Sequence, residues 1–197
     1  MRLFLAVDVP QSVKEWAARV RASVERRQPV AARGLRWVAP AQMHLTLRFL
    51  GETDPSVASS LSTEVGRGIR VAPFAMRVGS LAWLPPRGRP RVLVADIGEG
   101  RTELATLKVA ADDLVRRVTS LAPEDRPFSA HVTLARVRED LATLVDRERD
   151  AAIAACGPVP GLVSSIDRVV LYQSELSPRG PTYTALSTAR LDAALGP

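Results

Sequence analysis

The sequence is poor in the residues that build disulfides and metal centres. Its 197 residues include one cysteine, Cys156, and two histidines, His44 and His131. A single cysteine excludes an intrachain disulfide, and the cysteine and histidine supply together is too small for the usual zinc clusters. No apolar run approaches the ~18 residues that cross a membrane, and the first one stops at Asp8, too early for a signal peptide. We therefore expect a cytoplasmic protein with no cofactor, no metal and no membrane partner.

Lysine is also scarce, although the chain is basic. Of 27 basic residues only Lys14 and Lys108 are lysines, and the formal net charge is +6. A basic surface suits a polyanion such as RNA. A bias of the codons toward arginine, alanine and valine produces the same composition. The charge alone therefore leaves an RNA partner open.

Hydrophobic periodicity predicts a mixed chain in which strand often follows strand. Helices are expected over residues 12–28, 54–66, 101–118 and 139–155, and strands over 2–9, 34–38, 44–50, 73–84, 91–97, 128–137, 164–176 and 181–191. Consecutive strands pair most simply as antiparallel neighbours. The class is therefore α+β, as one globular domain or a pair of closely packed lobes.

Both histidines open the same four-residue pattern, His-apolar-Thr-Leu. The copies are "HLTL" from His44 and "HVTL" from His131. Side chains alternate between the two faces of a strand, so His44, Thr46 and Arg48 are expected to share one face. The same alternation pairs His131 with Thr133 on the second strand. If the two strands lie side by side, two imidazoles and two hydroxyls converge in one cleft.

A single histidine on a strand is usually a structural residue, and threonine is a common strand former. The repetition favours a paired site instead. Two imidazoles suit concerted acid–base chemistry near neutral pH, in which one accepts a proton from the attacking oxygen and the other donates one to the leaving oxygen. The threonine hydroxyls would hold the oxygens of a phosphate between them. The pattern therefore predicts a metal-free phosphodiesterase.

These motifs and their flanks resemble the two-histidine (2H) phosphoesterases. The stretches "RLFLAVDVP", "RWVAPAQMHLTLRFLGE", "RPFSAHVTLAR" and "LYQSELSPRGPTYTAL" are similar, in this order, to the bacterial and archaeal RNA 2′,3′-cyclic phosphodiesterases, also called LigT-like 2′-5′ RNA ligases. The resemblance implies two interleaved, pseudo-symmetric lobes of mostly antiparallel sheet with outer helices over residues 1–197. It also implies hydrolysis of an RNA-terminal 2′,3′-cyclic phosphate to a 2′-phosphate, with His44 as proton donor, His131 as proton acceptor, and Thr46 and Thr133 on the phosphate.

Further candidate substrate-binding residues are less specific. Arg48 could reach a phosphate or nucleotide, but a solvated arginine is equally expected. Arg126 and Phe128 flank the second motif, where Phe128 could stack on a base, although a core position is the better expectation. Arg136 has the wrong parity to face the cleft unless its strand bulges.

Three alternative functions remain open. The same site could join RNA through a 2′-5′ linkage, which is the reverse reaction. It could act on small cyclic nucleotides, or the chain could be a non-catalytic RNA-binding module, which the two intact motifs disfavour. We expect a monomer, and we expect its partner to be RNA with a 2′,3′-cyclic phosphate terminus.

Overall fold

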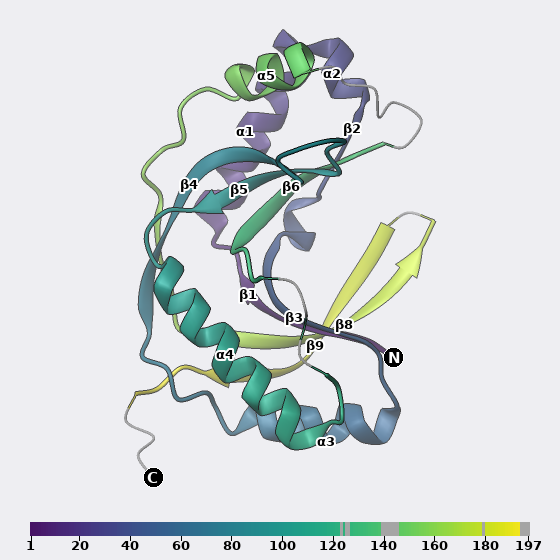
Figure 1. The fold of residues 1–197 in the computed structure, drawn as a ribbon, viewed down its shortest axis with the longest axis vertical. Coiled ribbons are helices and arrows are strands. Elements are labelled where there is room, and N and C mark those ends of the chain that lie inside the picture. Colours follow the sequence, from purple (N-terminus) through teal and green to yellow (C-terminus); the bar gives the residue numbers. More distant parts are fainter. Residues whose placement is uncertain (123, 125–126, 139–145, 179, 194–197) are drawn as a thin grey trace.

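Two antiparallel sheets form the framework of the molecule (Figure 1). The computed structural model describes residues 1–122, 124, 127–138, 146–178 and 180–193. The first sheet has the order β3 (His44–Glu52), β1 (Arg2–Asp8), β8 (Arg168–Ser177) and β9 (Gly180–Arg190). The second has the order β2 (Leu35–Trp37), β6 (His131–Val137), β5 (Val92–Ile97), β4 (Phe74–Leu84) and β7 (Val163–Ile166). The predicted α+β class with antiparallel sheets is confirmed.

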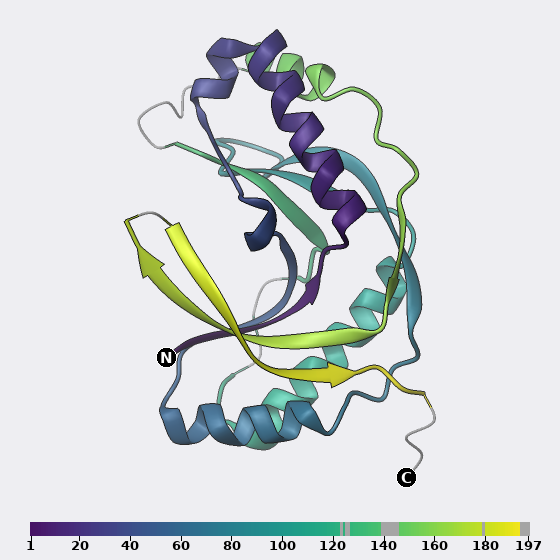
Figure 2. The same cartoon turned by 180° about the vertical axis from the view of Figure 1, so that it is seen from behind.

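Each sheet has its own helices. Helices α3 (Pro55–Gly66) and α4 (Arg101–Val118) contact each other and strands of the first sheet. Helices α1 (Gln11–Arg27), α2 (Pro29–Arg33) and α5 (Asp146–Ala155) contact one another beside the second sheet, and Figure 2 shows α1 lying across it. The short 3₁₀ helix η1 (Pro40–Gln42) leads directly into β3. Within the described residues, no helix is long and apolar enough to cross a membrane.

The chain passes repeatedly between the two sheets, so neither half of the sequence builds one sheet alone. Strand β1 begins in the first sheet, β2 belongs to the second, β3 returns to the first, and β4 to β7 lie in the second before β8 and β9 close the first. Apolar side chains from both sheets join one buried cluster. This interleaving places the two His-x-Thr strands in different sheets.

Most predicted elements are present, and the exceptions have local causes. The strand expected over 164–176 divides at Asp167, because β7 pairs with β4 in the second sheet while β8 pairs with β1 and β9 in the first. The pairing of β4 with β5 is irregular between Val78 and Leu81, and a Cβ atom at residue 79 would overlap the Asp96 carboxylate there. Residues 139–145 of the predicted last helix lie outside the described residues.

Candidate active site

The two His-x-Thr strands come together although they belong to different sheets. His44 and Thr46 lie on β3, and His131 and Thr133 lie on β6. Strands β3 and β6 contact each other, and the charge of His131 is close enough to affect the pKa of His44. The four motif side chains are all half-buried. The two strands predicted to lie side by side therefore contact each other, across the boundary between the sheets.

The same register surrounds both motifs. On β1, Asp8 lies opposite His44 and Ala6 opposite Thr46. On β5, Asp96 lies opposite His131 and Val94 opposite Thr133. Cross-strand partners share a face of their sheet, so each histidine has a carboxylate beside it. We call this side of each sheet the histidine face.

A bulge follows the threonine in both copies. Leu5 pairs with Arg48 and Ala6 with Thr46, so Leu47 has no partner on β1. Leu93 pairs with Ala135 and Val94 with Thr133, so Leu134 has no partner on β5. An extra residue in one strand reverses the alternation beyond it. The fifth residue of each motif therefore turns to the core and the sixth to the histidine face.

The first bulge makes the expected position of Arg48 wrong. Arg48 is only 4% exposed, whereas the next residue, Phe49, is 60% exposed. The ring of Phe4 lies 4.8 Å from that of His44 and 6.2 Å from that of Phe49, which puts Phe49 on the histidine face. Strict alternation along β3 predicts the reverse, with Arg48 on the histidine face and Phe49 in the core.

Arg48 instead belongs to a partly buried ionic group that joins β3 to α4. Its guanidinium lies 3.7 Å from Asp112 and 3.6 Å from Glu124, and it donates to the carbonyl oxygen of Ala122. Lys108 completes the group with contacts of 2.7 Å to Asp112 and 2.9 Å to Glu124. Arg48 therefore fixes the segment that follows α4 rather than facing the histidines.

The second bulge brings Arg136 to the histidine face. Its side chain is exposed, while Leu134 and Ala135 are fully buried in the core. Its positive charge is close enough to lower the pKa of His44 and that of Tyr183. Phe49 and Arg136 thus occupy equivalent positions after the two bulges.

Each histidine ring is held by the same hydrogen bond. Nδ1 of His44 lies 2.8 Å from the carbonyl oxygen of Gln42, and Nδ1 of His131 lies 2.7 Å from that of Ser129. A carbonyl oxygen only accepts, so Nδ1 carries the proton in both rings. In the neutral rings Nε2 is then the free acceptor. Both imidazoles are therefore arranged to exchange a proton through Nε2.

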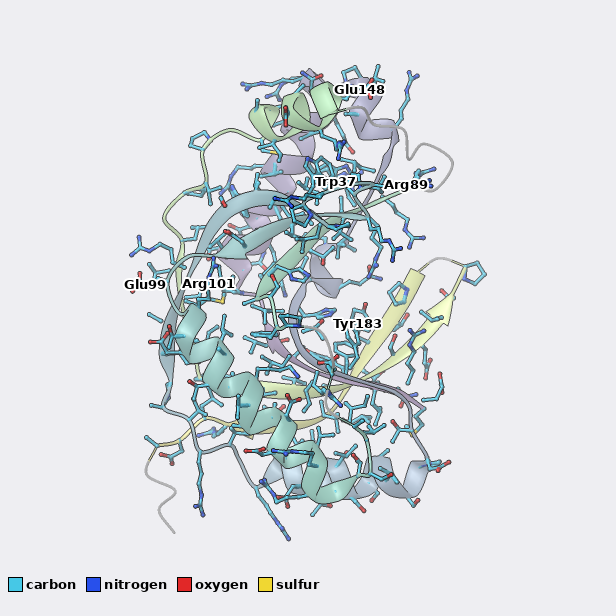
Figure 3. All side chains as sticks on the ribbon, in the orientation of Figure 1. Trp37, Arg89, Glu99, Arg101, Glu148 and Tyr183 are labelled. Carbon is cyan, nitrogen blue, oxygen red and sulfur yellow. The ribbon has the colours of Figure 1, made fainter. Side chains whose placement is uncertain are left out.

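The surroundings of His44 are aromatic. Phe4 lies against the ring. Tyr183, which comes from the hairpin of β8 and β9, meets the His44 ring edge-on with 5.1 Å between the ring centroids (Figure 3). Burial lowers the pKa of His44 below its ordinary value of 6.5. The Gln42 carbonyl and the Asp8 charge raise this pKa, whereas the charges of Arg136 and His131 lower it further. His44 is therefore readily deprotonated at neutral pH.

The threonine hydroxyls are open to a ligand. Within the described part of the chain, neither Thr46 nor Thr133 forms a side-chain hydrogen bond. No three His, Cys, Asp or Glu side chains among the described residues gather in a group suited to a metal ion. A surface recess lined by Trp16, Cys156 and Pro158 lies by α1, away from the histidine faces.

Arg126 and Phe128 are the remaining predicted substrate-binding residues. Arg126 lies outside the described residues. Phe128 is half-buried and packs against the hydrophobic core, which agrees with the structural interpretation of this side chain.

Comparisons with known proteins agree with this geometry. The profile of the LigT-like phosphoesterases matches residues 7–94. The "RNA 2′,3′-cyclic phosphodiesterase" of Thermus thermophilus is 36% identical over 94% of this chain and 88% of its own length. The protein of the same name from Aeropyrum pernix is 35% identical over 77% and 84%.

Solved structures have the same fold. The structure of TT0787 from Thermus thermophilus has a TM-score of 0.72 and 30% identity, over 97% of this chain and 98% of that one. The E. coli LigT structure complexed with 3′-AMP has a TM-score of 0.71 and 26% identity, over 96% and 97%. Two sheets that each contribute one His-x-Thr strand define the two-histidine class of phosphoesterases. Within that class, the chain belongs to the LigT-like phosphoesterase family.

Proposed function

We propose that this chain hydrolyses the 2′,3′-cyclic phosphate at an RNA 3′ end to a 2′-phosphate. One observation carries the proposal: two His-x-Thr strands with the same register, bulge and Nδ1 hydrogen bond meet, and neither Nε2 has a hydrogen-bond partner among the described residues. The relatives at 36% and 35% identity are named for this activity. A cyclic phosphodiester held between the rings meets a base on one side and an acid on the other.

The reaction needs one proton transfer at each histidine. His131 Nε2 accepts a proton from water as its oxygen attacks phosphorus. The bond between phosphorus and the 3′ oxygen breaks, and His44 Nε2 donates a proton to that oxygen. The lowered pKa of His44 makes its imidazolium a stronger acid for this step. When the substrate binds, the negative charge of its phosphate beside the ring raises the pKa of His44 and so keeps the imidazolium protonated until the reaction.

Thr46 and Thr133 donate hydrogen bonds to the non-bridging oxygens, which gain charge as phosphorus becomes five-coordinate. Arg136 contributes a positive charge to the same phosphate, since its charge already influences His44. Phe49 offers an exposed ring for stacking of the terminal base. Both motifs come from one chain, so we propose that a monomer suffices for activity. We further propose that the enzyme acts in the cytoplasm, where it meets RNA.

The deciding experiment is incubation with an RNA that ends in a 2′,3′-cyclic phosphate, with a chelator present. The expected product has a 2′-phosphate and a free 3′ hydroxyl, identified by its resistance to an enzyme that removes only 3′-phosphates. A 3′-phosphate product would reverse the assigned leaving oxygen. Addition of a second RNA with a free 5′ hydroxyl tests 2′-5′ ligation, in which this hydroxyl replaces water as the nucleophile, and hydrolysis is expected to predominate because water is in large excess.

A further inference from the structure

Two arginines lie directly opposite each other at the edge of the second sheet. Arg36 on β2 is the cross-strand partner of Arg136 on β6. Its neighbours Leu35 and Trp37 pack against the core, whereas Arg36 is exposed. The pair therefore shares one face, and the bulge at Leu134 makes this the histidine face.

Like charges directly opposite each other destabilise a sheet, because their side chains project in the same direction. Proteins commonly neutralise such a pair with a nearby carboxylate. Within the described residues, neither Arg36 nor Arg136 forms an ion pair or a side-chain hydrogen bond. Two unneutralised guanidinium groups side by side form a site for an anion with more than one charged group.

The pair extends away from the reacting centre. Arg136 is near enough to His44 for its charge to act on that ring, and it follows His131 on the same strand. Strand β2 lies on the far side of β6 from β5, so Arg36 is displaced from Arg136 by one strand, ~4.8 Å. An RNA 3′ end that places its cyclic phosphate near Arg136 has its preceding phosphate at the 5′ oxygen of the terminal nucleotide.

We propose that Arg36 binds the 5′ phosphate of the terminal nucleotide and thereby selects RNA ends over nucleoside cyclic phosphates that have a free 5′ hydroxyl. The assignment rests on the proposed function, since the cyclic phosphate is taken to lie between the histidines. Arg36 is a specificity-determining residue with no part in the proton transfers. It accounts for the choice between a polymer end and a small cyclic nucleotide, which the His-x-Thr motifs do not make.

Binding of two reaction products isolates this contact. Calorimetric titration compares adenosine 2′-phosphate with adenosine 2′,5′-bisphosphate, which differ only in the 5′ phosphate. The wild-type protein is expected to bind the bisphosphate about 10-fold more tightly, because a charge-assisted contact is added. The variant Arg36→Gln is expected to bind the two ligands equally, with the affinity for the monophosphate unchanged.

Arg19→Gln is the matched control. Arg19 is an exposed arginine on α1, a helix whose apolar side packs on the core behind the second sheet. This variant removes the same charge and is expected to keep the 10-fold preference. Arg36→Gln should unfold at the wild-type temperature or slightly above, since it relieves a like-charge pair. The salt slope for the bisphosphate should fall by about one in Arg36→Gln alone.

The outcomes separate this inference from the proposed function. Equal wild-type affinity for the two ligands, or a preference that survives in Arg36→Gln, overturns the role of Arg36. So does an equal loss of affinity for both ligands. Rates with cyclic phosphates are measured in parallel. A wild-type protein that opens no cyclic phosphate overturns the proposed function, and a binding preference that depends on Arg36 would still support the anion site.

Discussion

Asp8 lies directly opposite His44 in the ladder between β1 and β3, and its carboxylate accepts a hydrogen bond of 2.6 Å from the hydroxyl of Tyr172. The carboxylate raises the pKa of His44 against the larger effect of burial, which lowers it. Asp96 occupies the equivalent position opposite His131, where it accepts hydrogen bonds from Ser80. A carboxylate beside each imidazole is thus part of the repeated unit.

Asp8→Asn is expected to lower the pKa of His44 further. The substitution removes the negative charge that favours the imidazolium, while burial and the charge of Arg136 continue to oppose it. The chain has only two histidines, so NMR titration of the imidazole carbons resolves each ring, and His131→Gln leaves the signal of His44 alone. His44 of the wild-type protein should titrate below 6.5, the ordinary value.

Tyr172→Phe is the control for this substitution. It removes the hydrogen bond to Asp8 and keeps the carboxylate charge. The pKa of His44 in Tyr172→Phe should therefore stay close to the wild-type pKa. Activity that depends on protonated His44 is lost as the pH rises through the pKa of this histidine. Because Asp8→Asn lowers that pKa, the loss should begin at a lower pH in this variant than in the wild type. An unchanged titration of His44 in Asp8→Asn would contradict the assigned electrostatic effect.

The sequence predicted the paired histidines but not the residues that follow them. The expected strands, the helix over 101–118 and the buried side of α1 are present, because long periodic segments report their burial directly. The bulges at Leu47 and Leu134 were not predicted for β3 and only considered for β6, since alternation assumes a regular ladder. One signal was available: "LAVDV" (5–9) and "LVADI" (93–97) repeat opposite the two motifs.

Arg48→Met is expected to destabilise the fold by about 1–3 kcal/mol, because it leaves Asp112 and Glu124 with less neutralising charge in a partly buried site. Chemical denaturation monitored by circular dichroism measures this change. The control is Arg116→Met, which breaks the exposed ion pair between Arg116 and Asp113 on α4. It should lower the free energy of unfolding by less than about 0.5 kcal/mol. Equal losses of stability in the two variants would argue against a structural role for the ionic group around Arg48.

Removal of metal ions is expected to leave the activity unchanged. Acid–base chemistry between two imidazoles needs no Lewis acid, and the donors to the phosphate come from Thr46, Thr133 and Arg136. Hydrolysis after exhaustive dialysis against a chelator should proceed at the untreated rate. Loss of activity that returns only when a particular divalent ion is added would rule out the metal-free mechanism.

Phe49→Ala is expected to weaken substrate binding by about 10-fold with little change in the rate of the chemical step. The exposed ring lies on the histidine face and has no acid or base group to take part in the proton transfers, and base stacking on an aromatic residue is worth ~1–3 kcal/mol. Phe49→Tyr keeps a stacking surface and should behave as the wild type. KM and kcat for a short RNA with a cyclic phosphate separate the two effects. A loss confined to kcat would place Phe49 in the chemistry instead.

The sharpest test concerns the two histidines themselves. His44→Ala or His131→Ala should slow the chemical step by roughly 10²–10⁴-fold, because each removes one proton transfer. The double variant should lose less than the product of the two single losses, since groups that act as a unit are not additive. Single-turnover rates measure the chemical step without product release.

Thr46→Val and Thr133→Val provide the comparison within the same strands. Each removes one donor to the phosphate and keeps the β-branched shape, so the expected loss is smaller, roughly 10–10³-fold. All four side chains are half-buried on the histidine face, outside the hydrophobic core, so the variants should keep the wild-type circular dichroism spectrum. A folded His131→Ala protein with nearly full activity would disprove the two-imidazole mechanism, and the repeated strand register would then need a structural explanation.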